Sequence, residues 1–171
     1  MKRLFLWLLV LVAITLNVAA EEQRGGKTVN PAGTTAIHTV TKTLTTSQVN
    51  ALRATPITIV AAQGANTWME LISVVITYDY LTAAFTVAAD EDLVIEYTDG
   101  TDATASIETT GFLDQADDEI RYYKNAIADA ADIEALINKG FQIKNTGAGE
   151  IADGGGEVDV RLTYRIYTTG F

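Results

Sequence analysis

A period-two alternation of apolar and polar residues recurs along the chain and is clearest close to its end. Over residues 157–167 every second residue is apolar, and the residues between them are charged or carry hydroxyl groups. Because successive side chains of a strand point to opposite faces, this pattern predicts a half-buried strand with a charged outer face. The inward residues are expected to be Val158, Val160, Leu162, Tyr164 and Ile166.

Further strands are predicted where short apolar or branched runs are separated by turn residues. The segments are residues 39–45, 57–62, 68–80, 83–88, 93–98 and 103–109, with an Asp-Gly hairpin turn at residues 99–100. In the longest of them, alternation places one set on the same face: Trp68, Ile72, Val74, Ile76 and Tyr78. Many short strands at close spacing favour an antiparallel sandwich or barrel over alternating β-α units.

Two segments have helical spacing instead. One or two helical turns are predicted for residues 46–54, with Thr46 as the N-cap and an end ahead of Pro56. A longer helix is predicted for residues 126–139, with Gly140 as its stop. The inward positions are expected to be Val49 and Leu52 in the first, and Ile127, Ala130, Ile133 and Ile137 in the second.

The first twenty residues have the layout of a secretory signal peptide. Lys2 and Arg3 precede an uncharged run, and small residues at Val18 and Ala20 favour a cut after Ala20. A retained membrane anchor is the alternative, although the uncharged stretch is short for a bilayer. The polar, glycine-containing stretch 21–31 predicts a flexible arm. The predicted organisation is a signal-peptide-like segment (1–20), a flexible arm with the first strand (21–43) and a β-sandwich domain (44–171).

Composition limits the partners and the chemistry. The 171 residues include 22 acids, 12 Lys and Arg, and no Cys, giving a net charge of -10. Disulfides and thiolate metal sites are therefore excluded, and a nucleic-acid partner is not expected because phosphate contacts need clustered cations. Eighteen acids lie within residues 90–159. We interpret this acidic half as a solvated, self-repelling surface that discourages edge-to-edge association outside the intended contact.

Catalytic chemistry is not indicated by any motif. The one His, His38, has no serine nearby with which to form a triad, and is expected to be an exposed strand residue. The glycines at 147, 149 and 154–156 precede a strand and match no phosphate-binding loop, so they are expected in loops and turns. We therefore assign no catalytic, cofactor-binding or metal-binding residues and no cofactor. Calcium binding by one acidic cluster stays open: Asp114, Asp117, Asp118 and Glu119.

Several segments resemble, in the same order, a family of small virion structural proteins of tailed bacteriophages, of the capsid decoration or minor head protein type. The matching stretches are residues 44–62, 92–100, 110–114, 144–147 and 158–165, and none of them contains a catalytic motif. The resemblance implies an antiparallel β-sandwich of jelly-roll type that sits on the capsid or at a virion junction as a symmetric oligomer. Combined with the pattern, it predicts a mainly β, jelly-roll-like protein with one short helix.

The sequence supports three functional hypotheses. The first is a non-enzymatic virion component that decorates or cements the capsid as a symmetric homo-oligomer. It would contact the major capsid protein or neighbouring subunits, and neither nucleic acid nor a small-molecule substrate. The second is a secreted surface or filament subunit, in which the arm, residues 21–44, adds a strand to a neighbour's sheet. The third is a carbohydrate-binding or carbohydrate-active protein with a groove lined by Trp68, Tyr122 and Tyr123. The first predicts a place in the virion, and the second predicts secretion or the cell surface.

Overall fold

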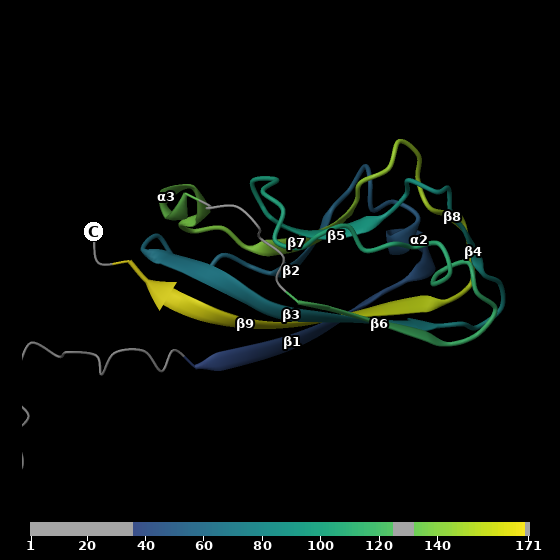
Figure 1. Cartoon of the computed structure of the whole chain (residues 1–171), viewed down its shortest axis with the longest axis horizontal. Coiled ribbons are helices and arrows are strands. Elements are labelled where there is room, and N and C mark those ends of the chain that lie inside the picture. Colours follow the sequence, from purple (N-terminus) through teal and green to yellow (C-terminus); the bar gives the residue numbers. More distant parts are fainter. Residues whose placement is uncertain (1–35, 125–131, 170–171) are drawn as a thin grey trace, which may run out of the picture. The chain divides into compact units, whose positions relative to one another are not determined.

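The computed structural model describes residues 36–124 and 132–169, and strands dominate this part of the chain. The strands are β1 (Ile37–Leu44), β2 (Ile57–Val60), β3 (Thr67–Asp79), β4 (Phe85–Thr86), β5 (Leu93–Tyr97), β6 (Glu119–Lys124), β7 (Phe141–Asn145), β8 (Ala152–Asp153) and β9 (Glu157–Thr168). Two four-residue helices, α2 (Thr46–Val49) and α3 (Ile133–Leu136), complete the set (Figure 1). The mainly β prediction is confirmed. The signal-peptide-like segment and most of the arm lie outside the described residues.

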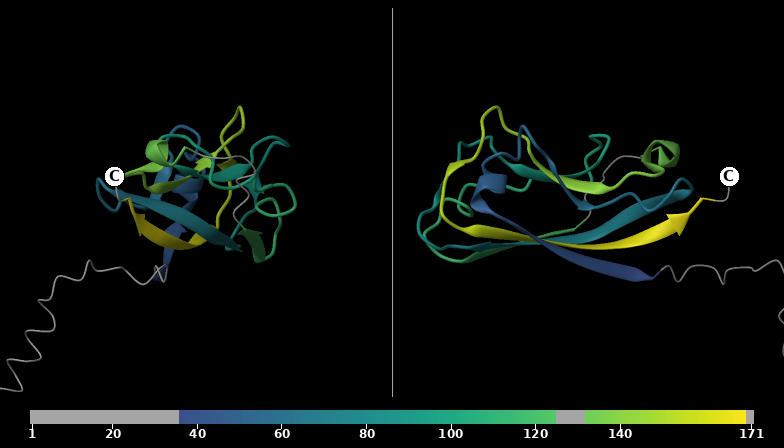
Figure 2. Two further views of the ribbon diagram at one scale, coloured as in Figure 1. Left: turned by 60° about the vertical axis from the view of Figure 1, so that its left-hand side comes forward. Right: turned by 180° about the vertical axis from the view of Figure 1, so that it is seen from behind.

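Two sheets face each other across the core. The larger has the strand order β1-β9-β3-β6, and the smaller has the order β2-β7-β5. All of their pairings are antiparallel. The segment that follows the Asp-Gly turn extends the smaller sheet through two isolated bridges, Leu93 to Ile107 and Glu96 to Asp102. A short β4-β8 pair closes one end (Figure 2). None of the helices in the described ranges is long and apolar enough to cross a bilayer.

The connectivity is that of a jelly roll. In chain order, the eight paired segments are β1, β2, β3, β5, residues 102–107, β6, β7 and β9. The first pairs with the eighth, the second with the seventh, the third with the sixth, and the fourth bridges to the fifth. This is a single long hairpin rolled into two layers, as in jelly-roll domains. The antiparallel, jelly-roll-like sandwich is therefore confirmed.

The core lies between the sheets because the alternating residues of both layers point inward. Val160 and Leu162 of β9, predicted to face inward, are fully buried. The smaller sheet contributes Phe141 of β7 and Tyr97 of β5, which pack against each other with ring centroids 4.8 Å apart. The Tyr97 hydroxyl donates to the carbonyl of Met69 at 2.6 Å, which ties the two sheets together.

The first helical segment follows its prediction closely. Val49 and Leu52 are buried as predicted. The N-cap of α2 is Thr45 and not Thr46, because the backbone is still extended at Thr45 and Gln48 completes a capping box with it.

The predicted faces of β3 are wrong in its first half. The register with β9 shifts between Leu71 and Ser73, which marks a β-bulge. One extra residue in a strand reverses the faces of everything on one side of it. Met69 and Leu71 are therefore buried, whereas Trp68 and Ile72 are only half-buried.

Three other predictions differ from the structure. The strand over residues 103–109 is reduced to one isolated bridge at Ile107, with the second bridge just ahead of it at Asp102, and the strand over 83–88 is reduced to β4. The helix predicted for 126–139 falls partly outside the described residues. In its described part the helix consists of α3 alone. It begins at Ile133 because Asp132 has an extended backbone and is the N-cap, with its carboxylate accepting the backbone N–H of Glu134. Leu136, not Ile133, is the buried residue of this helix.

Candidate interaction surface

The outward side of the larger sheet is the most distinctive surface of the described residues, and we call it the outer face. It is built by one set of alternating positions on four strands, whose register aligns them in rows. The rows are Thr43, Asp159, Thr77 and Ile120; Thr41, Arg161, Val75 and Tyr122; and Thr39, Thr163, Ser73 and Lys124. Branched and hydroxyl residues favour the pleated strand conformation, which explains their density here.

Apolar side chains stand exposed on the β6 side of the outer face. Tyr122 is 69% exposed and Ile120 is 46% exposed, on neighbouring rows. A shallow hollow of about 290 Å³ lies beside them, lined by Thr41, Val75, Thr77, Ile120, Asp159 and Arg161. A large exposed aromatic beside branched and hydroxyl residues is typical of a protein contact surface.

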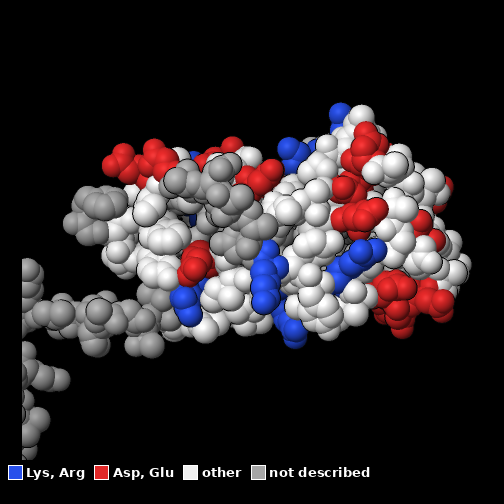
Figure 3. Space-filling model, in the orientation of Figure 1, with Lys and Arg blue, Asp and Glu red and all other residues white. Residues whose placement is uncertain are grey.

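The charge of the outer face differs from that of the chain as a whole. Arg161 and Lys124 are exposed, and neither forms an ion pair with another described residue. Glu70 is neutralised by Arg165 at 3.5 Å and also accepts the Tyr167 hydroxyl at 2.8 Å. Acidic side chains lie at the end that carries β4 and β8, and others lie over α3 at the opposite end (Figure 3). In the three rows Arg161 and Lys124 outweigh Asp159 by one charge, so the outer face is weakly cationic on an acidic protein.

Two members of the acidic cluster at residues 114–119, Asp114 and Asp118, accept hydrogen bonds from the backbone. The Oδ1 atom of Asp114 accepts the backbone N–H groups of Gly111 and Phe112 at 2.7 and 3.2 Å. Asp118 accepts the N–H of Tyr80 at 3.0 Å. Within residues 36–124 and 132–169, no group of three His, Cys, Asp or Glu side chains is arranged to hold a metal ion.

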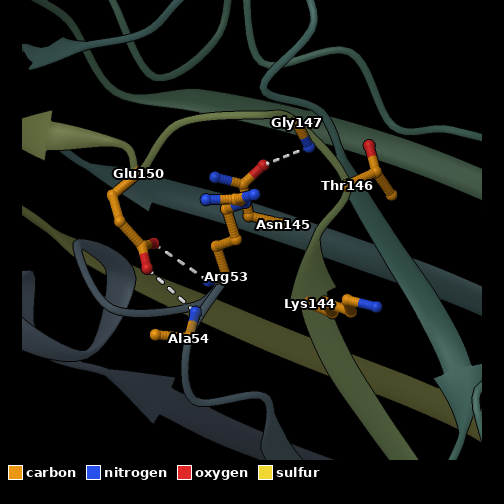
Figure 4. A pocket seen from close by; sticks show the side chains of 7 residues that line it. All are labelled: Arg53, Ala54, Lys144, Asn145, Thr146, Gly147 and Glu150. Atoms are coloured by element: carbon orange, nitrogen blue, oxygen red, sulfur yellow. Dashed lines mark hydrogen bonds between the residues drawn. The ribbon is translucent and has the colours of Figure 1, made fainter.

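A second hollow, of about 390 Å³, lies where two of the sequence stretches singled out above meet. Its lining residues are Arg53, Ala54, Lys144, Asn145, Thr146, Gly147 and Glu150 (Figure 4). Most of its polar groups already have partners. Both carboxylate oxygens of Glu150 accept backbone N–H groups, from Arg53 at 3.0 Å and from Ala54 at 2.8 Å. The Nζ atom of Lys144 lies 3.8 Å from Glu96. We therefore regard this hollow as a structural junction.

The junction leads to a stability prediction. Glu150→Ala should lower the free energy of unfolding by about 1–2 kcal/mol, because two backbone donors lose a charged acceptor. Urea unfolding followed by circular dichroism measures the change. Glu108→Ala makes the same substitution at an exposed carboxylate and should change stability by less than about 0.5 kcal/mol. Equal effects of the two substitutions would show that Glu150 has no special role.

The structure separates the aromatic residues that the sequence had grouped. Trp68 stacks on Tyr167 with centroids 4.5 Å apart, and Tyr123 packs against the core. Tyr122 alone of the three projects freely, so they do not line one groove. His38 is half-buried and stacks on Tyr164 at 5.4 Å, and is not the exposed residue expected.

Comparisons with known proteins add limited information. No protein-family model matches the chain. No curated protein matches it in sequence. Among solved structures, a chain of the cyanophage Pam1 capsid asymmetric unit is similar with 14% identity and a TM-score of 0.46, covering 76% of this chain and 83% of that one. A chain of the capsid of Ralstonia phage GP4 is similar with 14% identity and a TM-score of 0.36, covering 82% and 89%. TM-scores below 0.5 do not establish a common fold or a common role.

Proposed function

We propose that this protein is a non-enzymatic structural component of a bacteriophage virion, which decorates or cements the capsid as a symmetric oligomer. The observation that carries the proposal is the outer face, a broad sheet surface on which Tyr122, Ile120 and Arg161 stand exposed. Such a surface suits a neighbouring protein subunit, because apolar contact supplies affinity and the cation selects an acidic partner.

The use of polar side chains elsewhere supports a structural role. Glu150, Asp114 and Asp118 each accept backbone N–H groups, so these carboxylates hold loops in place. Of the charged residues that line the junction hollow, Glu150 accepts two backbone N–H groups and Lys144 Nζ lies 3.8 Å from Glu96, so both hold the surrounding structure.

The fold agrees with the proposal without deciding it. Jelly rolls occur in viral capsid proteins, but also in lectins and cupins, and a fold alone does not define a function. The segments that resemble phage virion proteins favour the first of these classes. Two of them, residues 44–62 and 144–147, come from distant parts of the chain and meet at the junction of Glu150.

The secreted-subunit hypothesis has less support. It requires residues 21–44 to leave as a donor strand, yet residues Ile37–Leu44 pair along their whole length with β9 of the same chain. A donor strand would have to come from residues ahead of 36, which lie outside the described part.

The proposal is tested by locating the protein and then by binding it back to particles. We expect it in purified virions in a fixed ratio to the major capsid protein, measured by quantitative mass spectrometry. Tyr122→Asp should weaken binding of the purified protein to particles that lack it by at least about tenfold, because a charge replaces the central apolar contact.

The matched control is Leu81→Asp, which changes an equally apolar, 58% exposed residue outside the sheets. It should leave binding to particles unchanged. Equal loss with both variants would argue against the outer face as the contact. A mature N-terminus at Glu21, in a secreted or envelope fraction and absent from virions, would overturn the proposal in favour of the secreted subunit.

A further inference from the structure

β1 is an edge strand with one side available for pairing. In the order β1-β9-β3-β6 it has a neighbour on one side only. Its eight residues pair with β9 without a register shift, so the strand is regular from end to end. The N–H and C=O groups on its other side therefore find no strand partner within the described residues (Figures 1 and 2). Such an edge is a template for another strand.

β1 lacks most of the features that normally protect an edge strand. It contains no proline and no bulge. Its one charged residue, Lys42, turns away from the outer face and donates from Nζ to the carbonyl of Thr58 at 2.8 Å. The outward positions are all uncharged: Ile37, Thr39, Thr41 and Thr43. By contrast, the opposite edge, β6, carries Glu119, Arg121 and Lys124.

The local absence of acids allows a second copy of this chain to reach the β1 edge. Two molecules with a net charge of -10 repel each other over most of their surfaces. Residues 36–69, which include β1 and the adjoining α2 and β2, contain no Asp or Glu. The β1 edge is therefore a place where two copies can meet with little repulsion.

We propose that β1 pairs with β1 of a second copy, antiparallel across a two-fold axis at Thr41, joining the two larger sheets into one. This inference rests on the oligomer of the proposed function, but not on its place in a virion. The axis sets Thr41 opposite its own copy, Thr39 opposite Thr43, and Val40 opposite Lys42. Facing threonines stabilise antiparallel pairs, and this register places no two like charges opposite each other.

The natural absence of Cys allows a direct test in the full-length chain. With Thr41→Cys, the two thiols would face each other at a Cβ separation of roughly 4.5–5.5 Å, close to what a disulfide needs. We expect disulfide-linked dimers to form under mild oxidation at least about tenfold faster than with Thr101→Cys. That control is the same substitution at an exposed residue outside β1.

A mixed experiment tests the register. A tagged Thr39→Cys variant and an untagged Thr43→Cys variant should form heterodimers faster than either forms homodimers, because only unlike positions face each other.

Sedimentation of the wild-type chain should show a dimer in solution. A monomer at all concentrations would overturn the inference, and so would a dimer in which the Thr41→Cys variant cross-links no faster than the Thr101→Cys variant. Either result would leave the particle-binding test of the proposed function unaffected.

Discussion

Replacing Gly154 with Ala should destabilise the protein by about 2–4 kcal/mol, one of the two largest effects that we expect. Gly154 has φ of +81°, a conformation that costs an L-residue with a side chain about 1 kcal/mol or more. An added Cβ would also overlap the ring of Phe85, which is only 2% exposed. Because Phe85 packs against Tyr78 in the core, the ring cannot move without disturbing its neighbours. Urea unfolding of the purified variant measures the loss.

Gly100→Ala is the matched control for this prediction. Gly100 has φ of +91°, but a Cβ there would meet nothing within 4 Å. Its substitution isolates the cost of the backbone conformation, which should be about 1 kcal/mol. The difference between the two variants is then the cost of crowding Phe85. If both lose the same stability, the close approach of Gly154 to the ring is not a constraint.

Strand boundaries and inward residues were predictable where one face of the strand is buried and the other is exposed to solvent. β9 has its predicted boundaries within one residue, and its predicted inward residues Val158, Val160 and Leu162 are fully buried. The loop positions of Gly147 and Gly154 were also predictable from the strand that follows them. The need for glycine at these two positions was not predictable. A side chain there would collide with Glu91 or Phe85, which are far away in sequence.

Failures of prediction have identifiable physical causes. A β-bulge leaves no mark on composition, so alternation carried through residues 71–73 gives the wrong face for Trp68. Apolar residues at helical spacing favoured a helix over residues 126–139, although Asp132 is a typical N-cap residue. In the structure Asp132 is the N-cap of α3, which therefore begins at Ile133. Residues 103–109 alternate like a strand but make only one bridge, at Ile107.

The candidate interaction surface was the least predictable feature. β6 was not predicted as a strand, because its outward residues, Ile120 and Tyr122, are apolar and an inward-side residue is Arg121. The structure accounts for this inversion: the Arg121 guanidinium lies over the Phe112 ring at 5.5 Å and donates to the Gly111 carbonyl at 2.9 Å. An apolar residue that faces water on an edge strand is visible as a contact candidate only once the sheet order is known.

Alkaline pH should produce the second large effect, through Tyr97. Burial raises the pKa of Tyr97 to about 12, with smaller contributions from Glu70 and then Asp99. The unfolded chain ionises this phenol near its ordinary pKa of 10.0, so the folded state binds the proton more tightly. The resulting stability is fully present below pH 10 and is lost as the pH rises through about 12. Two pKa units correspond to a loss of about 2–3 kcal/mol.

Tyr97→Phe separates this titration from other alkaline effects. The variant gives up the hydrogen bond to the Met69 carbonyl and should be about 1–2 kcal/mol less stable at pH 7. Its stability should then fall less steeply than that of the wild type between pH 10 and 12. A remaining slope is expected because burial also raises the pKa of Tyr78, with help from Tyr80 and Asp118. Tyr122→Phe, at an exposed phenol, should retain the wild-type profile. If Tyr97→Phe retains it too, the Tyr97 phenol does not stabilise the fold by staying protonated between the two sheets.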